Sequence, residues 1–256
     1  MTKPAPLSEQ ELAAIRRSGQ ILAQAMQQVI AAIRRGVVAT IELDTLAESA
    51  IRKLGGNPAF KGYRGYPRTI CISVNDEVVH GVPRKNKILK EGAVVSLDLG
   101  VVYRGMYTDM ATTVVVSRQT RQTEIIAVAQ AALREGLRQV RAGATTGDIG
   151  AAVQQLIEAH DYSVVRDLVG HGVGRSIHEE PSIPNFGQPG TGSRLRSGTA
   201  IAVEPMITAG RYTVTTDGDG WTVRTADGSL AAHEERTVLV TDHGYELLTP
   251  PRWDES

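Results

Sequence analysis

The sequence predicts an α+β fold in which one helix-and-strand unit occurs twice within a single domain. Two stretches with helical periodicity come first, and runs rich in β-branched residues follow them. The same order returns after residue 124, and short segments of the two parts align at an offset of 106 residues. We therefore expect one domain over residues 1–256, with related halves over residues 8–116 and 121–248.

The first half should contain two helices and then strands. Ser8 and Glu11 form a capping-box signature, apolar residues then recur at helical spacing, and Gly36 is a stop signal. A second helix is expected over Ile41–Leu54, because Gly55 follows it. The β-branched runs predict strands at Thr69–Val74, Val94–Leu99 and Thr112–Val116, with Gly100–Gly105 joining the last two in a hairpin.

The second half repeats this order. Helices are expected over Glu124–Arg141 and Asp148–Ala159. Strands are expected at Ser163–Val169, Ala200–Glu204 and Thr237–Thr241. The offset of 106 residues places Thr40, Glu42 and Leu43 on Thr146, Asp148 and Ile149, and Ser96-Leu97-Asp98 on Ala202-Val203-Glu204. A match this short can arise by chance, but it pairs two strand-borne acids and so suggests a site between the halves.

Composition excludes several classes of function. Lys and Arg together number 28, as do Asp and Glu, so no net charge holds the molecule on nucleic acid or on a membrane. Cys71 is the only cysteine, which excludes an internal disulfide framework and a thiolate metal cluster. The first seven residues lack the apolar core of a secretory signal. We therefore expect a soluble, cytoplasmic protein.

Two aspartates lie in strands that should form one hairpin. Asp98 lies in Val-Val-Ser-Leu-Asp-Leu-Gly, and Asp109 lies in Tyr-Thr-Asp-Met-Ala-Thr-Thr. A carboxylate among apolar strand residues is costly to bury unless it is paired, protonated or bound to a cation. Either residue alone is better explained as a turn or edge aspartate, but two across a hairpin favour a cation site.

Two glutamates in the second half resemble this pair. Glu204 follows an apolar run, and Pro205 after it should end or bend the strand. Glu235 precedes the apolar run Val238-Leu239-Val240. For Glu235 a solvated acid at the start of a strand remains a strong alternative, because Glu234 is its neighbour.

Three histidines lie in unusual surroundings. His171 is flanked by glycines, which allow a sharp turn or a close backbone approach, and a single histidine of this kind is more often a loop residue than a ligand. His178 opens His-Glu-Glu-Pro, and His80 lies in Val-Val-His-Gly-Val-Pro. Each has an ordinary explanation alone, but together with the four acids they indicate a metal site.

These motifs, in this order, resemble those of type I methionine aminopeptidases. The matching segments are Gly-Tyr-Pro at 65–67, Cys-Ile-Ser-Val-Asn at 71–75, Asp98 and Asp109, Gly-His-Gly-Val-Gly at 170–174, His-Glu-Glu-Pro at 178–181, Glu-Pro-Met at 204–206 and Glu235. The resemblance covers nearly the whole chain and implies a pita-bread fold, in which two pseudo-symmetric α/β halves form a curved antiparallel sheet backed by helices. The compact 178–204 segment resembles the short bacterial form.

The resemblance implies a single catalytic domain that removes the initiator methionine from nascent polypeptides with a small second residue. It implies two divalent metal ions (Co, Mn, Fe or Zn) that activate a shared water. The implied metal ligands are Asp98, Asp109, His171, Glu204 and Glu235, with Asp109 and Glu235 bridging. Glu204 would also be the acid–base group, while His178 and His80 would contact the substrate carbonyl and the leaving nitrogen.

The implied methionine pocket contains aromatic and sulfur-bearing side chains, which suit a flexible thioether. Its members are Tyr63, Tyr66, Cys71, Ile177 and Trp221. Each of them alone is more often a core residue. Position 177 is often Phe in that family, and a His is common at position 236, where this chain has Arg236. His233 lies two residues before Glu235, so we predict that it lines the cleft without binding metal.

Other functions are compatible with the same fold. A proline-specific peptidase usually carries a large additional N-terminal domain, and a metal-free creatinase-like hydrolase would lack the ligands that this chain keeps. A binding protein acting in nucleic-acid or ribosome association would also tend to lose them. Transient ribosome contact through the basic run Arg84, Lys85, Lys87 and Lys90 is compatible with activity, although a solvated loop explains that run better. We expect a monomer that binds no membrane and no specific nucleic acid.

Overall fold

The computed structural model describes residues 5–36, 38–117 and 123–250. Four α-helices lie in this part of the chain: α1 (Glu9–Ile33), α2 (Thr40–Lys53), α3 (Glu124–Arg138) and α4 (Thr146–Glu158). The first-half strands are β1 (Val38–Ala39), β2 (Asn57–Pro58), β3 (Ile70–Val74), β4 (Glu77–Val79), β5 (Ile88–Leu89), β6 (Val94–Tyr103) and β7 (Met106–Val115), with a 3-10 turn η1 (Tyr63–Gly65). The second-half strands are β8 (Ser163–Val164), β9 (Gly170–Val173), β10 (Glu179–Ile183), β11 (Ala200–Val203), β12 (Met206–Thr208), β13 (Val214–Thr216), β14 (Val223–Thr225), β15 (Ala231–His233), β16 (Glu235–Val240) and β17 (Tyr245–Leu247).

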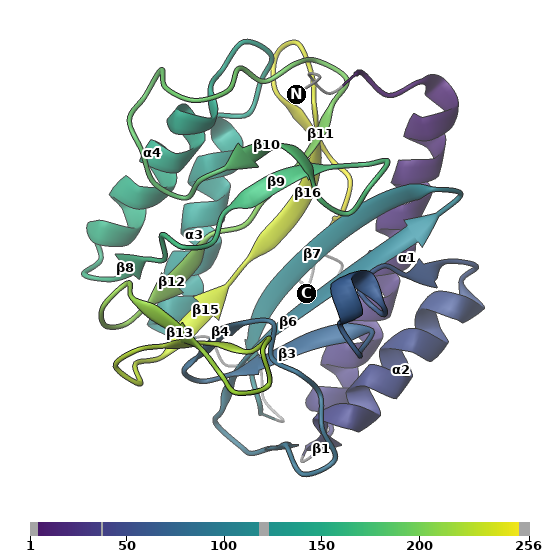
Figure 1. Cartoon of the computed structure of the whole chain (residues 1–256), viewed down its shortest axis with the longest axis vertical. Helices are drawn as coiled ribbons and strands as arrows, with labels where there is room; N and C mark the ends of the chain where they lie inside the picture. Colours follow the sequence, from purple (N-terminus) through teal and green to yellow (C-terminus); the bar gives the residue numbers. More distant parts are fainter. Residues whose placement is uncertain (1–4, 37, 118–122, 251–256) are drawn as a thin grey trace.

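A curved antiparallel sheet joins the two halves (Figure 1). Its strand order is β10-β9-β11-β16-β7-β6-β2, with β3 also paired to β6 and β17 to β16. The pairing of β16 with β7 connects the halves and sets Glu235 opposite Ala111. At this seam the start of β16 lies beside the middle of β7.

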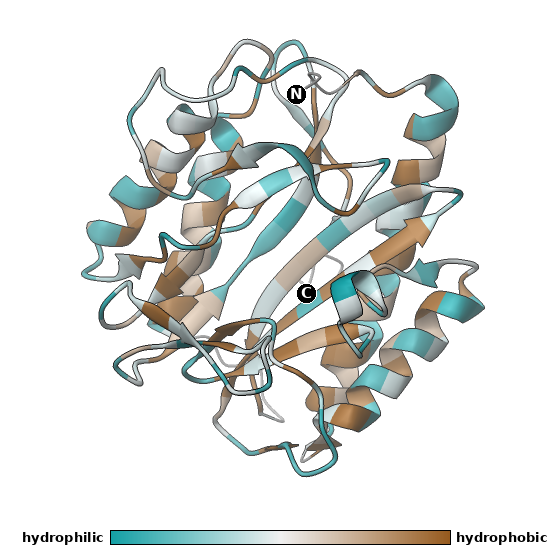
Figure 2. Ribbon diagram, in the orientation of Figure 1, coloured by the Kyte–Doolittle hydropathy of each residue, from teal (hydrophilic) through white to brown (hydrophobic). Residues whose placement is uncertain are grey.

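Each half of the sheet has its own helices and its own apolar core. Apolar residues of α1 and α2 pack on β3, β6 and β7, while those of α3 and α4 pack on β11 and β16. Figure 2 shows the alternating polar and apolar faces of these helices. An amphipathic helix gains stability by burying its apolar face, so the two helix pairs hold the sheet in a fixed curvature.

The repeat found in the sequence coincides with repeated elements. The helices α2 and α4 begin at Thr40 and Thr146, and the strands β6 and β11 begin at Val94 and Ala200; both pairs are separated by 106 residues. Residues 121 and 122, at the predicted start of the second half, lie outside the described residues. The capping box at Ser8 is present, with its hydroxyl accepting from the Glu11 amide.

Several predicted boundaries were wrong for identifiable reasons. The hairpin turn lies at Arg104-Gly105, and Gly100 is part of β6, where a Cβ would lie 2.6 Å from the Phe60 ring. Gly100 therefore permits close packing within a strand and does not form the turn. The predicted strand Ser163–Val169 is reduced to the two residues of β8. The strand β9 was missed, because its glycines do not resemble a β-branched run.

Candidate active site

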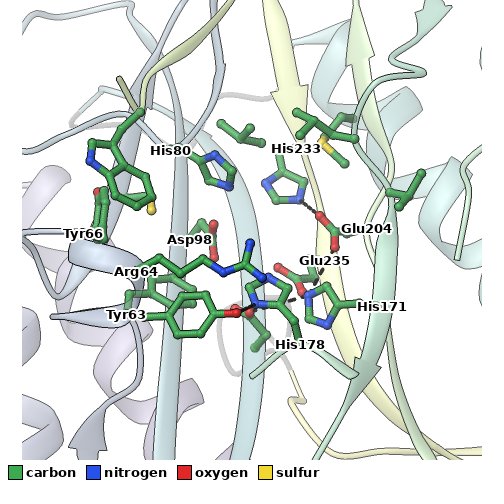
Figure 3. A pocket seen from close by; sticks show the side chains of 18 residues that line it. Tyr63, Arg64, Tyr66, His80, Asp98, His171, His178, Glu204, His233 and Glu235 are labelled. Carbon is green, nitrogen blue, oxygen red and sulfur yellow. Dashed lines mark hydrogen bonds and ion pairs between the residues drawn. The ribbon is translucent and has the colours of Figure 1, made fainter. Parts of the chain in front are cut away.

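A pocket of about 210 Å³ lies on the sheet at the seam between the halves (Figure 3). Nearly all of the predicted site residues line it: Tyr63, Tyr66, Cys71, His80, Asp98, Asp109, His171, His178, Glu204, Trp221, His233 and Glu235. These residues span most of the chain, and the fold brings them together. The sequence did not single out Phe60, Arg64, Val79, Leu168, Val169 and Met206, which also line the pocket.

Four carboxylates come from neighbouring strands across the seam. Asp98 lies on β6, Asp109 on β7 and Glu235 on β16, and Glu204 directly follows β11. Asp98 and Asp109 are 8% and 3% exposed, and Glu235 is 2% exposed. Oδ1 of Asp98 and Oε1 of Glu235 are buried without a hydrogen-bond partner. Such orphaned acceptors are costly, so the strands provide acidic oxygen atoms that require a partner.

Burial raises the pKa of all four carboxyl groups. It raises the pKa of Asp98 to about 7 and that of Glu204 to about 8. Burial and the neighbouring carboxylates raise the pKa values of Asp109 and Glu235 well above their usual range. Four acids in one buried cluster are compatible with neutral pH only if protons or cations compensate their charge. The donor set therefore fits divalent cations.

His171 is directed at this cluster from β9. Its Nε2 lies 3.5 Å from Oε1 of Glu204 and 4.0 Å from Oδ2 of Asp109. Its Nδ1 contacts the Gly172 carbonyl oxygen at 2.9 Å, which favours the tautomer with a proton on Nδ1 and a lone pair on Nε2. One ligand atom each from Asp109, His171 and Glu235 lies within 4.8 Å of the other two. This trio is the tightest candidate metal centre in the described part of the chain.

Glycines on both sides of His171 allow β9 to lie against its neighbours. A Cβ at Gly170 would lie 2.5 Å from the Ala202 carbonyl oxygen, and one at Gly172 would lie 2.2 Å from that of Glu180. His171 is thus a strand residue, and the loop alternative that the sequence left open for a single histidine does not hold. Its glycines permit close backbone approach, which was the alternative use that the sequence allowed.

Three further imidazoles surround the acids. The Nδ1 atom of His178 lies 3.1 Å from the Tyr63 hydroxyl, and its ring centroid is 4.3 Å from that of His171. His80 has a left-handed backbone with φ of 58°. His233 is 2% exposed, and its Nε2 lies 3.5 Å from Oε2 of Glu204. Burial lowers the pKa of His80, His171 and His233 to about 4 and that of His178 to about 3, so all four are neutral at pH 7.

One comparison identifies the family to which this site belongs. A sequence model described as "Metallopeptidase family M24" matches residues 13–242. This chain belongs to metallopeptidase family M24. It is 43% identical over 243 residues to a methionine aminopeptidase of Clostridium perfringens, an alignment that covers 94% of this chain and 97% of the relative.

Solved structures place the M24 chain in the same fold. The crystal structure of a methionine aminopeptidase from Thermotoga maritima superimposes with a TM-score of 0.91 at 40% identity and covers 96% of this chain and 99% of that one. The prolidase from Pyrococcus furiosus gives a TM-score of 0.75 at 24% identity, over 96% of this chain and 65% of that one. That identity shows the fold alone. The expected pita-bread fold is confirmed.

Membership of M24 makes the chain a metallopeptidase that uses divalent metal.

The structure also decides the surroundings of Glu235 and Ile177. Glu234 and Glu235 are both buried, and Glu234 accepts a hydrogen bond from the Thr113 amide, so the solvated-acid alternative for Glu235 was wrong. Ile177 is 2% exposed in an apolar cluster with Phe60 and does not itself line the pocket.

Proposed function

We propose that this M24 enzyme removes the N-terminal methionine from new polypeptides by hydrolysing the first peptide bond. The observation that carries the proposal is the convergence of Asp109, His171 and Glu235, from the strands β7, β9 and β16, next to an apolar pocket wall. Relatives that bear the name methionine aminopeptidase match 94% of the chain at 43% and 40% identity, which supports the same substrate. The proposal includes a preference for a small second residue.

The residues that would hold the metal are Asp98, Asp109, His171, Glu204 and Glu235. Asp109 and Glu235 lie on β7 and β16, the paired strands of the seam, so they would hold metal where the two halves meet. One imidazole among four carboxylates suits Mn, Fe, Co or Zn better than Ca or Mg. When bound, such ions supply Lewis-acid polarisation of the substrate carbonyl and a water of lowered pKa.

The chain's own groups would handle the protons and the developing charge. Glu204 directly follows β11, and its Oε1 lies 3.5 Å from Nε2 of His171, beside the other acids. A carboxylate at this place would accept a proton from the attacking water and deliver it to the leaving amine. His178 and His80 are neutral donors that line the same pocket. The N–H group of His178 would stabilise the substrate carbonyl oxygen, and that of His80 would contact the leaving nitrogen.

The apolar side of the pocket supports a methionine subsite. The rings of Tyr66 and Trp221 meet edge to face at a centroid distance of 5.1 Å, and Cys71 lies in the same cluster. Aromatic faces and a sulfur atom suit the polarizable thioether of methionine. Tyr63 continues this wall toward His178, with which its ring is stacked at 5.2 Å. Ile177 would shape the subsite from the second layer.

The direct test is the release of free methionine from short peptides. Metal-stripped protein is assayed on Met-Ala-Ser, Leu-Ala-Ser and Met-Trp-Ser, with and without Co, Mn, Fe or Zn. We expect metal-dependent release that favours Met over Leu and Ala over Trp, and its loss in Asp109→Asn. Activity on X-Pro peptides in place of these would support a proline-specific peptidase. Absence of hydrolysis with every metal would favour a binding protein.

The proposed partners are the N-termini of nascent polypeptides in the cytoplasm, met by a monomeric enzyme. Among the described residues, no helix has the length and apolarity of a membrane span. In the basic run, Arg84 pairs with Asp219 and Lys87 with Glu77. These internal pairs support a structural use of the run over ribosome contact, and charge reversal at Lys85 and Lys90 should leave ribosome binding unchanged.

A further inference from the structure

Asp219, in the turn between β13 and β14, binds groups from two sides of the pocket. Its Oδ1 accepts hydrogen bonds from the amides of Trp221 at 2.9 Å and Thr222 at 2.8 Å. Its Oδ2 accepts from the Thr222 hydroxyl at 2.7 Å and from Arg84 at 2.6 Å. The side chain of Asp219 is only 14% exposed. One carboxylate therefore fixes the backbone that carries Trp221.

Thr222 extends this connection to the segment that carries His80. Its hydroxyl oxygen accepts a hydrogen bond from the Val82 amide at 3.4 Å. The adjacent Gly81 amide donates to the Ser73 hydroxyl at 3.1 Å, and a Cβ at Gly81 would lie 2.2 Å from the Ile72 carbonyl oxygen. The segment is thus fixed on both sides, which explains how His80 keeps its left-handed backbone.

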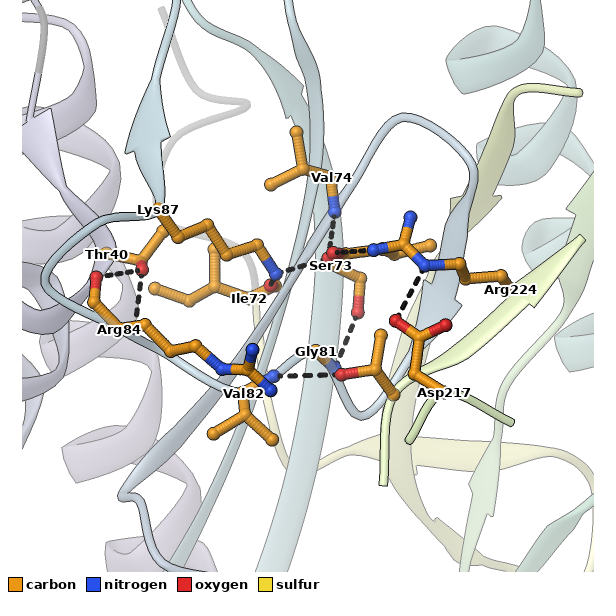
Figure 4. A network of polar contacts seen from close by, with 12 residues as sticks. Thr40, Ile72, Ser73, Val74, Gly81, Val82, Arg84, Lys87, Asp217 and Arg224 are labelled. Carbon is orange, nitrogen blue, oxygen red and sulfur yellow. Dashed lines mark hydrogen bonds and ion pairs between the residues drawn. The ribbon is translucent and has the colours of Figure 1, made fainter. Parts of the chain in front are cut away.

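A wider polar network anchors both segments to the sheet (Figure 4). Glu77 accepts from the Val74 amide and from Arg224, and it pairs with Lys87. Arg224 on β14 also donates to Asp217, and Lys87 donates to the Ile72 carbonyl oxygen. These contacts hold the β13–β14 hairpin at a fixed place beside β3 and β4. Within that frame, Asp219 connects the Trp221 turn to Thr222 and Arg84, and Thr222 contacts Val82 in the segment that carries His80.

We propose that Asp219 is a positioning residue that sets the spacing between the Trp221 wall and His80. The inference rests on the proposed function and adds to it a residue that does not line the pocket. Trp221 would contact the methionine side chain, and His80 would contact the leaving nitrogen. Their relative placement therefore decides whether a bound methionine presents its peptide bond to the acids. Asp219 acts on both through hydrogen bonds and does not touch the substrate.

Two near-isosteric variants separate the two connections. Asp219→Asn keeps one oxygen acceptor but places an amide N–H₂ where Thr222 and Arg84 require an acceptor. Thr222→Val removes the hydroxyl contacts to Val82 and to Oδ2 of Asp219, but it leaves the Trp221 and Thr222 amides bound to Oδ1 of Asp219. We expect Asp219→Asn to lower kcat/KM for Met-Ala-Ser about tenfold, the order of one hydrogen bond to a charged group. Thr222→Val should lower kcat without raising KM, and it should add little to Asp219→Asn, because both variants break one chain of contacts.

A measurement without substrate distinguishes this claim from the proposed function. The chain has two tryptophans, so a Trp253→Phe background leaves Trp221 as the only indole. Asp219→Asn should shift the Trp221 emission to the red and increase its acrylamide quenching, whereas Thr222→Val should not. Asp227→Asn is the matched control, because Asp227 makes the same kind of turn through Ser229, outside the pocket lining.

The outcomes separate cleanly. The positioning role would be overturned if Asp219→Asn showed the same acrylamide quenching and the same kcat/KM as the Asp227→Asn control. A general loss of folding would appear as a lowered melting temperature in both Asp219→Asn and the Asp227→Asn control. If the wild-type enzyme releases no methionine with any metal, the proposed function fails, while the quenching experiment still tests whether Asp219 holds Trp221.

Discussion

At the scale of single residues, the most informative feature is the carboxylate of Glu204 between two imidazoles. The Nε2 of His171 lies 3.5 Å from Oε1, and the Nε2 of His233 lies 3.5 Å from Oε2. The tightest three-residue cluster contains His171, whereas His233 is not part of it. Both ring nitrogens of His233 lack a hydrogen-bond partner, so its role differs from that of His171.

We predict that only one of these imidazoles is a metal ligand. His171→Ala should weaken Mn or Co binding at least about tenfold, since even outer partners of ligands contribute that much. His233→Gln should keep the wild-type affinity and stoichiometry, because His233 lies outside the cluster of Asp109, His171 and Glu235. Isothermal titration of metal into stripped protein measures both. Loss of one bound ion in His233→Gln would show that His233 is a ligand.

The thiol of Cys71 should be unreactive in the folded enzyme. It is 4% exposed, and its pKa is raised by burial and then by the nearby Asp98 carboxylate. Because the thiolate is the nucleophile, iodoacetamide at pH 8 should label the native protein more than about tenfold more slowly than the urea-unfolded chain. Cys71 is the only cysteine, so mass spectrometry reports on it alone. Equal labelling rates would contradict the prediction.

At the scale of elements, β9 shows how glycines let a strand that carries a candidate metal ligand pack closely against its neighbours. Gly172 lies opposite Glu179 of β10, and a Cβ there would lie 2.2 Å from the Glu180 carbonyl oxygen. We expect Gly172→Ala to lower the free energy of unfolding by about 2–3 kcal/mol, the cost of overpacking. Gly244→Ala is the control, because a Cβ there meets no atom within 4 Å. Urea unfolding of both variants tests this. Equal unfolding midpoints for Gly172→Ala and Gly244→Ala would contradict the prediction.

The long elements were predictable because their signals are local. The capping box at Ser8 and the helical periodicity that follows it define α1, and a β-branched run defines β3. Short strands were harder to predict: β8 was predicted too long, and β9 was missed. They exist because neighbouring strands pair with them, and a two- to four-residue segment carries no periodicity of its own.

The same contrast holds within the site. The acids and histidines were identified because polar residues in apolar or glycine-rich runs demand an explanation. Asp219 gave no such signal, because an aspartate between two glycines is typical of an ordinary turn. Its role depends on Thr222 and Val82, which come together only after β14 pairs with β4. Ile177 was predicted for the pocket wall, but it does not line the pocket and packs in the apolar cluster with Phe60 and Cys71.

At the scale of the whole molecule, the buried acids and histidines at the seam make the stability of the fold depend on pH. Burial raises the pKa of Asp98 from 3.8 to about 7 and that of Glu204 from 4.5 to about 8. Burial lowers the pKa of four histidines from 6.5 to about 3 or 4: His80, His171, His178 and His233. Below pH 6.5 the two sets oppose each other, because raised acids favour the folded state at low pH and lowered histidines favour it at higher pH.

Between pH 7 and pH 8 the acids dominate the titration, because histidines with a pKa of 6.5 in the unfolded chain are then mostly neutral in both states. The folded chain then holds more protons than the unfolded chain, so the metal-stripped enzyme should lose stability as pH rises through this window. Metal should reverse the trend, because deprotonated carboxylates bind it more tightly at pH 8. The melting temperature of stripped and Mn-loaded protein at both pH values measures this. Asp98→Asn should flatten the decline of the stripped enzyme and Asp227→Asn should not, and an unchanged slope in Asp98→Asn would refute the assignment.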